Sequence, residues 1–147
     1  MPWNYWVTVA ATAAAVIACV ILHYEGLRLL GKSLPVHRHN HRARVVVLIL
    51  GLLALHITEI WVFGGGYYLL LLGSENGSLE GGGPMSLLDC VYYSASVFST
   101  LGFGDIVPKG PIRFMTGTEA IAGLTLITWS ASYTFLFMQK IWDFNDD

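Results

Sequence analysis

The fold expected for this chain follows from one stretch, STLGFGD at Ser99–Asp105. Two glycines alternate with larger residues in it, so the backbone is free to adopt positive φ angles at Gly102 and Gly104. A strand of this kind turns successive carbonyl oxygens toward one side. Four such strands around an axis would stack rings of carbonyl oxygens, which are able to replace the water shell of a dehydrated cation.

Composition indicates that the chain is an integral membrane protein. Of its 147 residues, 54% are hydrophobic and 12% are charged, and the mean hydropathy is +0.58. A soluble domain carries about 25% charged residues, and here the apolar residues also gather in long runs. The net charge of -2 gives no indication of a nucleic-acid partner. Cys19 and Cys90 have no metal-binding or redox spacing and are interpreted as two buried thiols.

The first membrane-spanning helix is predicted within residues 1–30. Aromatic residues at Trp3, Tyr5 and Trp6 precede an uncharged run from Val7 to Leu22, and such aromatics anchor helix ends at the membrane interface. Together they cover about 20 residues, the length that a bilayer requires. A cleaved signal peptide is the competing interpretation. Lys and Arg follow this run instead of preceding it, which favours a retained helix.

Residues 31–44 are predicted to form a cytoplasmic loop, because short loops rich in Lys and Arg stay on that side of the membrane. The basic residues of this loop are Lys32, Arg38, Arg42 and Arg44. The loop also contains His37, His39 and His41. Two interpretations of these histidines stay open, namely a metal or pH-sensing site and an ordinary basic cluster at the membrane interface. Their alternate spacing favours the second.

An outer helix over residues 45–72 is the second predicted span. His56 and Glu59 lie inside it, about one helical turn apart, so both are able to share one face. Ionisable groups at membrane depth are costly and face protein or water. Gly64–Gly66 is expected to loosen this helix, and the sequence leaves open whether the helix continues through it. The loop that follows, residues 73–84, has no Lys or Arg, which fits the outer side of the membrane.

A short pore helix over residues 86–98 is predicted next. Ser86 and Asp89 have the spacing of a capping box, with Asp in place of the usual Glu or Gln. This helix is too short to span a bilayer, as expected of a re-entrant pore helix. The inner helix is predicted over residues 112–142, with a cytoplasmic tail at 143–147. This order of spans places the N-terminus outside and the C-terminus in the cytoplasm.

With these elements in place, the segment from Ser86 to Met138 resembles the pore helix, filter and inner helix of the two-transmembrane potassium-channel superfamily. The resemblance is closest to small bacterial ion-channel proteins and covers a pore module at residues 45–142. The N-terminal helix lies outside this module. The resemblance implies an all-α membrane protein with three transmembrane helices, a re-entrant pore helix and a selectivity-filter loop, assembled around a tetrameric pore.

The resemblance also implies roles for individual residues. Ion sites would be formed by backbone carbonyls, and one hydroxyl, of Thr100, Leu101, Gly102 and Phe103. The shape and support of the filter would come from Gly104, Asp105, Ser96 and Ser99. The aromatic pair that braces the filter from behind is matched by Tyr92 and Tyr93. A gating hinge is matched by Gly123, and the residues that would line the cavity are Leu124, Ile127, Ala131 and Phe135. Ordinary packing or lipid contact is the competing interpretation for those four.

Three residues depart from the family pattern. Leu101 replaces the common Val or Ile, and Phe103 replaces Tyr and so lacks the hydroxyl hydrogen bond of that side chain. Ser96 stands where some members carry a Glu that pairs with the Asp behind the filter. Potassium selectivity is expected to be kept, because Phe does occur in potassium filters.

Glu119 lies inside the predicted inner helix, where a charge is costly unless it is paired or hydrated. One hypothesis is that it faces the back of the filter or the outer helix and meets His56 or a hydroxyl group. The alternative is a neutral, hydrogen-bonded carboxylic acid with a structural role.

The function expected from the sequence is passive, selective conduction of K⁺ across the cell membrane. A nonselective cation channel and a non-conducting membrane accessory subunit are the alternatives. No residue set indicates catalysis, and no cofactor is expected beyond K⁺ as the permeant ion. The expected partners are further copies of the chain, membrane lipids and monovalent cations.

Overall fold

The computed structural model of the chain describes residues 3–34, 41–73, 75–81 and 83–143. Two of the three histidines predicted as a loop cluster, His37 and His39, lie outside the described residues, as does most of the predicted tail, residues 144–147.

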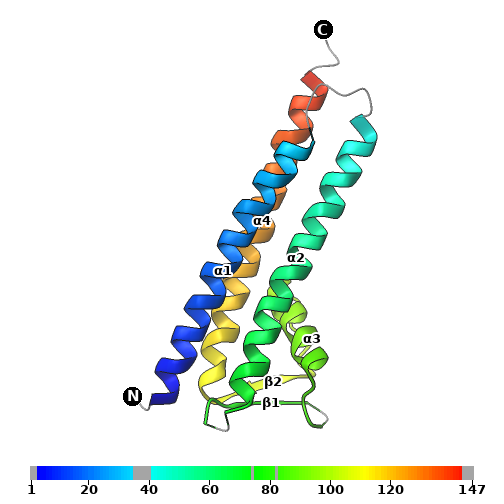
Figure 1. Cartoon of the computed structure of the whole chain (residues 1–147). Coiled ribbons are helices and arrows are strands. Elements are labelled where there is room, and N and C mark those ends of the chain that lie inside the picture. The colour runs from blue at the N-terminus through cyan, green and yellow to red at the C-terminus, as the bar shows by residue number, and fades with distance from the viewer. Residues whose placement is uncertain (1–2, 35–40, 74, 82, 144–147) are drawn as a thin grey trace.

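Three long helices make up most of the molecule: α1 (Trp3–Ser33), α2 (His41–Leu71) and α4 (Arg113–Asp143). Each has 31 residues. At 1.5 Å per residue each is about 46 Å long, which exceeds the roughly 30 Å hydrocarbon core of a bilayer. All three are apolar enough to cross a membrane, and they run alongside one another (Figure 1). The protein is therefore an all-α membrane protein with three candidate spans.

The short elements gather at the end of the bundle opposite the C-terminus (Figure 1). They are β1 (Ser78–Glu80), α3 (Leu87–Phe98), β2 (Val107–Lys109) and the 3-10 turn η1 (Gly110–Ile112). The two strands pair antiparallel, with Leu79 opposite Pro108. This pairing joins the loop before α3 to the segment after Ser99–Asp105, the predicted filter, so both ends of the predicted pore segment are tied together. Ser99–Asp105 is called the filter below.

The helix α3 begins with the capping box that the sequence predicts. The Ser86 hydroxyl accepts a hydrogen bond from the Asp89 amide at 3.2 Å, and the Asp89 carboxylate accepts one from the Ser86 amide at 2.8 Å. Asp therefore replaces the usual Glu at this position without loss of either bond. The Ser86 hydroxyl and the Ser86 amide both donate to the Asp89 carboxylate, at 2.7 and 2.8 Å, and hold the pKa of this carboxyl below its usual range.

The connector between α1 and α2 is shorter than the predicted loop at 31–44. The helix α1 continues through Gly31 to Ser33, and α2 already begins at His41. A side chain at Gly31 would meet the hydroxyl of Tyr133 on α4, so this glycine makes room for a neighbouring helix and does not end its own.

The helix α2 also continues through Gly64–Gly66 to Leu71, so the expected loosening at these glycines does not occur. A Cβ atom added to Gly64 would lie 2.8 Å from the Cα atom of Val91 on α3. Small residues allow helix backbones to approach one another closely in membrane proteins. Gly64 therefore serves as a contact surface on which the pore helix packs.

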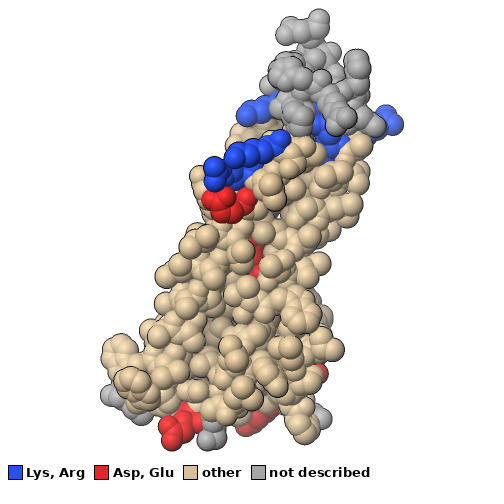
Figure 2. Space-filling model, in the orientation of Figure 1, with Lys and Arg blue, Asp and Glu red and all other residues tan. Residues whose placement is uncertain are grey.

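Lys and Arg gather at the end of the bundle that carries the C-terminus (Figure 2). Asp and Glu lie at the end that carries the short elements, and also beside the basic group, where Glu25 pairs with Arg28. Lys109 lies among the short elements, 3.9 Å from Glu80. Between the ends, the surface is largely uncharged. The predicted buried thiols are confirmed, since Cys19 and Cys90 are both fully buried and free.

Candidate functional site

The stretch Ser99–Asp105 follows directly on α3 and has an alternating backbone conformation. The φ angle is 59° at Thr100, 56° at Gly102 and 78° at Gly104, while Leu101 and Phe103 between them have no positive φ. Gly102 and Gly104 thus have the left-handed conformation expected from the sequence. Thr100 shares it and is the one non-glycine residue with positive φ in the described part of the chain.

The amide groups of this stretch face α3. The Leu101 and Gly102 amides donate to the Ser96 carbonyl at 3.0 and 3.1 Å, and the Phe103 amide donates to the Ser96 hydroxyl at 3.4 Å. When residues alternate between mirror-image conformations, successive N–H groups lie on one edge of the chain and successive carbonyl groups on the other. Because the amide edge rests on Ser96, we expect the carbonyl edge to face away from α3.

Ser96, which the sequence predicts to support the filter, bonds to the stretch Ser99–Asp105 through two groups. Both its carbonyl and its hydroxyl accept from the filter backbone, a function that a serine fulfils without any carboxylate pair. Ser99 ends α3 and donates its hydroxyl back to the Ala95 carbonyl at 2.7 Å. The C-terminal end of α3, where the helix dipole is negative, therefore lies directly at the start of the filter.

Tyr92 is the aromatic residue that contacts the filter. Its hydroxyl donates to the Asp105 carboxylate at 2.8 Å, and its ring stacks parallel to that of Phe103 at a centroid distance of 6.3 Å. The carboxylate raises the pKa of the Tyr92 phenol above its ordinary value. Tyr92 therefore links α3 to Asp105 by a hydrogen bond and to Phe103 by ring stacking.

Within one chain, Tyr93 contacts neighbouring helices, and its support of the filter stays a prediction. Its hydroxyl lies 3.0 Å from that of Thr116 on α4, and its ring packs edge-on against Tyr67 of α2. Adjacent residues of an α-helix point about 100° apart, so when Tyr92 faces the filter Tyr93 faces the neighbouring helices.

Glu119 of α4 is fully buried and bonded to hydroxyl groups on two other helices. Tyr67 of α2 donates to one carboxylate oxygen and Ser94 of α3 to the other, each at 2.5 Å. The prediction that Glu119 pairs with His56 is wrong, because His56 bonds to Glu59, about one turn away on the same helix. Sequence reasoning missed Tyr67 and Ser94. The sequence does indicate that a buried carboxylate needs hydrogen-bond donors. It does not identify them, because many of its hydroxyl groups are able to donate.

A comparison with known families agrees with this geometry. A family model described as "Ion channel" matches residues 43–140, about two thirds of the chain. The chain belongs to the ion channel family. The match includes α3 and the filter stretch, most of α2 and of α4, and none of α1.

This ion channel also resembles "Uncharacterized membrane protein YdjJ" of Bacillus subtilis (strain 168), with 34% identity over 87 residues. The alignment covers 56% of the channel and 26% of that relative, so the channel spans about a quarter of its length. No solved structure matches the channel.

Gly123 of the channel lies where α4 crosses the end of α3. A Cβ atom added there would lie 2.9 Å from the Cα and carbonyl carbon of Phe98 and would overlap its carbonyl oxygen. The helix α4 is continuous through this position. Gly123 is thus a close backbone contact that fixes the last residue of α3, and its role as a gating hinge stays a prediction.

The predicted cavity-lining face of α4 is not used for packing within one chain of the channel. All four of its residues are exposed, among them Leu124 at 54% and Phe135 at 59%. The filter side chains Leu101 and Phe103 are exposed as well, at 61% and 62%. The filter and this α4 face are therefore available to further copies of the chain.

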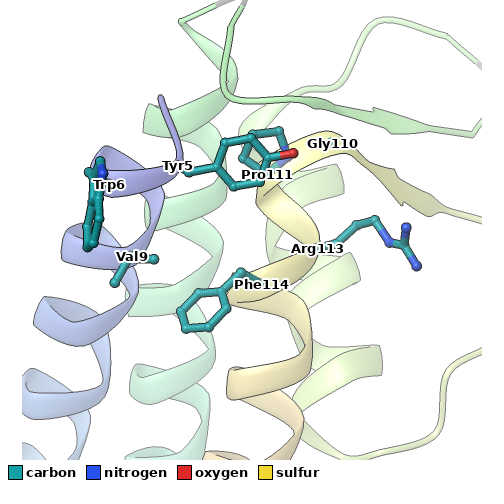
Figure 3. Close-up of a pocket in the computed structure, with 7 residues that line it drawn as sticks. All are labelled: Tyr5, Trp6, Val9, Gly110, Pro111, Arg113 and Phe114. Carbon is teal, nitrogen blue, oxygen red and sulfur yellow. The ribbon is translucent and has the colours of Figure 1, made fainter. Parts of the chain in front are cut away.

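A pocket of about 520 Å³ lies at the end of the channel that carries the short elements, between the start of α1 and the start of α4 (Figure 3). Its lining is Tyr5, Trp6, Val9, Gly110, Pro111, Arg113 and Phe114. Aromatic side chains of this kind anchor helix ends at the membrane interface. None of these residues belongs to the filter, so the pocket is separate from the candidate ion path.

Proposed function

We propose that this ion channel conducts K⁺ passively and selectively through a pore formed by four copies of the chain. The observation that carries the proposal is the alternation of φ along Thr100–Gly104, with the amide edge of the stretch held on Ser96. It leaves a row of carbonyl oxygens on the opposite edge, and rings of such carbonyls replace the hydration shell of K⁺.

Four copies are proposed because one chain supplies one row of carbonyl groups, and a ring requires closed rotational symmetry. The exposure of Leu101, Phe103 and the α4 face supports this assembly, since these surfaces have no cover within one chain. The negative end of the α3 dipole, repeated four times, would favour a cation that waits below the filter.

We also propose that the basic end of the bundle lies in the cytoplasm and that the filter opens to the outside. The support is the charge distribution of Figure 2 together with the positive-inside rule. The N-terminus then lies outside and the C-terminus inside, in the cell membrane, among lipids that cover the uncharged middle of the bundle.

The test is ion flux in liposomes that contain this protein alone, with K⁺ and then Na⁺ as the gradient ion. We expect K⁺ flux with little Na⁺ flux, abolished by Gly102→Ala. Within one chain an added Cβ at Gly102 meets no neighbour, so there the variant acts through the φ of 56°, which alanine adopts only at a cost. Gly65→Ala is the matched control, because Gly65 also has open space but an ordinary helical conformation.

Three outcomes would contradict the proposal. Equal flux of K⁺ and Na⁺ would assign a nonselective cation channel. Absence of flux under all pH and tension conditions from a folded oligomer would assign an accessory subunit. Flux that survives Gly102→Ala would place the ion path elsewhere.

A further inference from the structure

Three ionisable side chains meet in the interior of the bundle, away from the filter. His23 of α1 and His56 of α2 both point their Nδ1 atoms at the carboxylate of Glu59, at 2.8 Å from Oε1 and 2.9 Å from Oε2. His23 and Glu59 are fully buried, and the His56 side chain is 16% exposed. One nitrogen from each histidine and an oxygen of Glu59 all lie within 4.8 Å of one another.

A positive charge would balance this cluster, supplied either by a proton on one histidine or by a bound cation. The ion pairs of Glu59 are both with these histidines, which leave the cluster with one negative charge when they are neutral. A carboxylate at membrane depth is costly unless a cation balances it. Two imidazole nitrogens and one carboxylate oxygen are the donors that Zn²⁺ and related divalent cations prefer.

The surroundings of His23 also suit a metal ligand. Histidine ligands donate their second ring N–H to a partner that fixes the tautomer and the ring orientation. The other ring nitrogen of His23, Nε2, lies 3.4 Å from the Ser130 hydroxyl on α4. When Nδ1 binds a metal, Nε2 carries the ring proton and donates a hydrogen bond to the Ser130 hydroxyl. The partial exposure of His56 provides a route by which an ion enters.

We propose that His23, His56 and Glu59 form a binding site for one divalent transition-metal cation of the zinc class. This site would link α1, which lies outside the residues matched to the ion channel family, to α2. It would also lie close to the pore helix, because the His56 ring is 5.9 Å from that of Phe98, the last residue of α3. The proposal does not depend on ion selectivity or on the oligomeric state.

The experiment measures Zn²⁺ bound to the full chain, purified in detergent with a tag that contains no histidine. The loop histidines offer a second binding place, so the background variant carries His37→Asn, His39→Asn and His41→Asn. We expect one Zn²⁺ per chain in this background. In the same background, His56→Gln and Glu59→Gln should each weaken Zn²⁺ binding on the order of 100-fold, and Ser130→Ala about 10-fold.

Thr58→Ala is the matched control. Thr58 lies between the two α2 ligands but is exposed and donates to the Ala54 carbonyl of its own helix, so its loss should leave Zn²⁺ affinity unchanged. If His56→Gln or Glu59→Gln does not fold, His56→Cys keeps a metal-binding group at the most accessible position and should retain one Zn²⁺ per chain.

Two results would overturn the proposal. The first is a background variant that binds no Zn²⁺ and gains no thermal stability from it, since the cluster would then be a hydrogen-bonded pair of histidines around a carboxylate. The second is Zn²⁺ binding that does not follow the ligands. Folded His56→Gln and Glu59→Gln would then each still bind Zn²⁺, or His56→Cys would bind none.

Discussion

Substitution of Gly123 by alanine tests whether the junction of α3 and α4 depends on a close backbone contact. The added Cβ would lie 2.9 Å from two backbone carbons of Phe98, and backbone atoms are unable to rotate away as a flexible side chain does. Overpacking of this kind costs about 1–3 kcal/mol. Replacing a helical glycine by alanine contributes roughly 1 kcal/mol in the opposite direction.

The control Gly65→Ala separates these two effects, because its added Cβ meets no neighbour within 4 Å. That variant receives the helix-propensity gain alone. We therefore expect Gly123→Ala to be less stable than Gly65→Ala by about 1–3 kcal/mol in unfolding from mixed micelles. Since Phe98 directly precedes the filter, K⁺ flux should fall in Gly123→Ala and stay unchanged in Gly65→Ala.

The reasoning is refuted if Gly123→Ala matches Gly65→Ala in stability and conducts normally. A different pattern, with equal stability but altered open probability, would show that Gly123 acts as a hinge and not as a packing contact. The two roles predicted for this glycine are thus separated by one pair of variants.

Three further predictions concern the polar contacts around the pore helix. Glu119→Leu removes the acceptor at 2.5 Å from the Tyr67 hydroxyl, which keeps only the Thr116 hydroxyl at 3.5 Å. The free energy of unfolding, measured by chemical unfolding, should fall by about 1–3 kcal/mol, and Glu119→Gln should be less affected. Tyr92→Phe keeps the ring stacked on Phe103 but removes the bond to Asp105, so filter stability, measured as the persistence of K⁺ flux on heating, should fall. Because the pKa of Tyr92 is raised, the wild-type bond persists past the usual phenol range and is lost as pH rises through the raised pKa, which ultraviolet titration against Tyr92→Phe detects. The pKa of Asp89 is lowered, so the stability that its carboxylate contributes is present above the usual carboxyl pKa and is lost as pH falls through the lowered pKa. The melting temperature should therefore fall in acid. Asp89→Ala should remove this dependence, and Asp89→Glu, which keeps the capping box, should retain it.

Local features of this channel follow from the sequence. Gly102 and Gly104 predict positive φ angles, because few other residues adopt such angles at low cost. The Ser86–Asp89 spacing predicts the cap of α3, since both partners lie within one helical turn. The three spans follow from run length and hydropathy. Each of these signals depends only on residues that are close in the chain.

The tertiary structure alone decided which residues meet across the bundle. Sequence reasoning expected Gly64–Gly66 to loosen a helix, whereas Gly64 lets α3 pack on a continuous α2. The sequence predicted His56 as a partner of Glu119, whereas His56 bonds to Glu59. The bond between His23 and Glu59 was not predicted. These contacts depend on how the helices rotate and cross, which hydropathy leaves free. A buried carboxylate demands a donor, but only the packed helices determine which hydroxyl or imidazole supplies it.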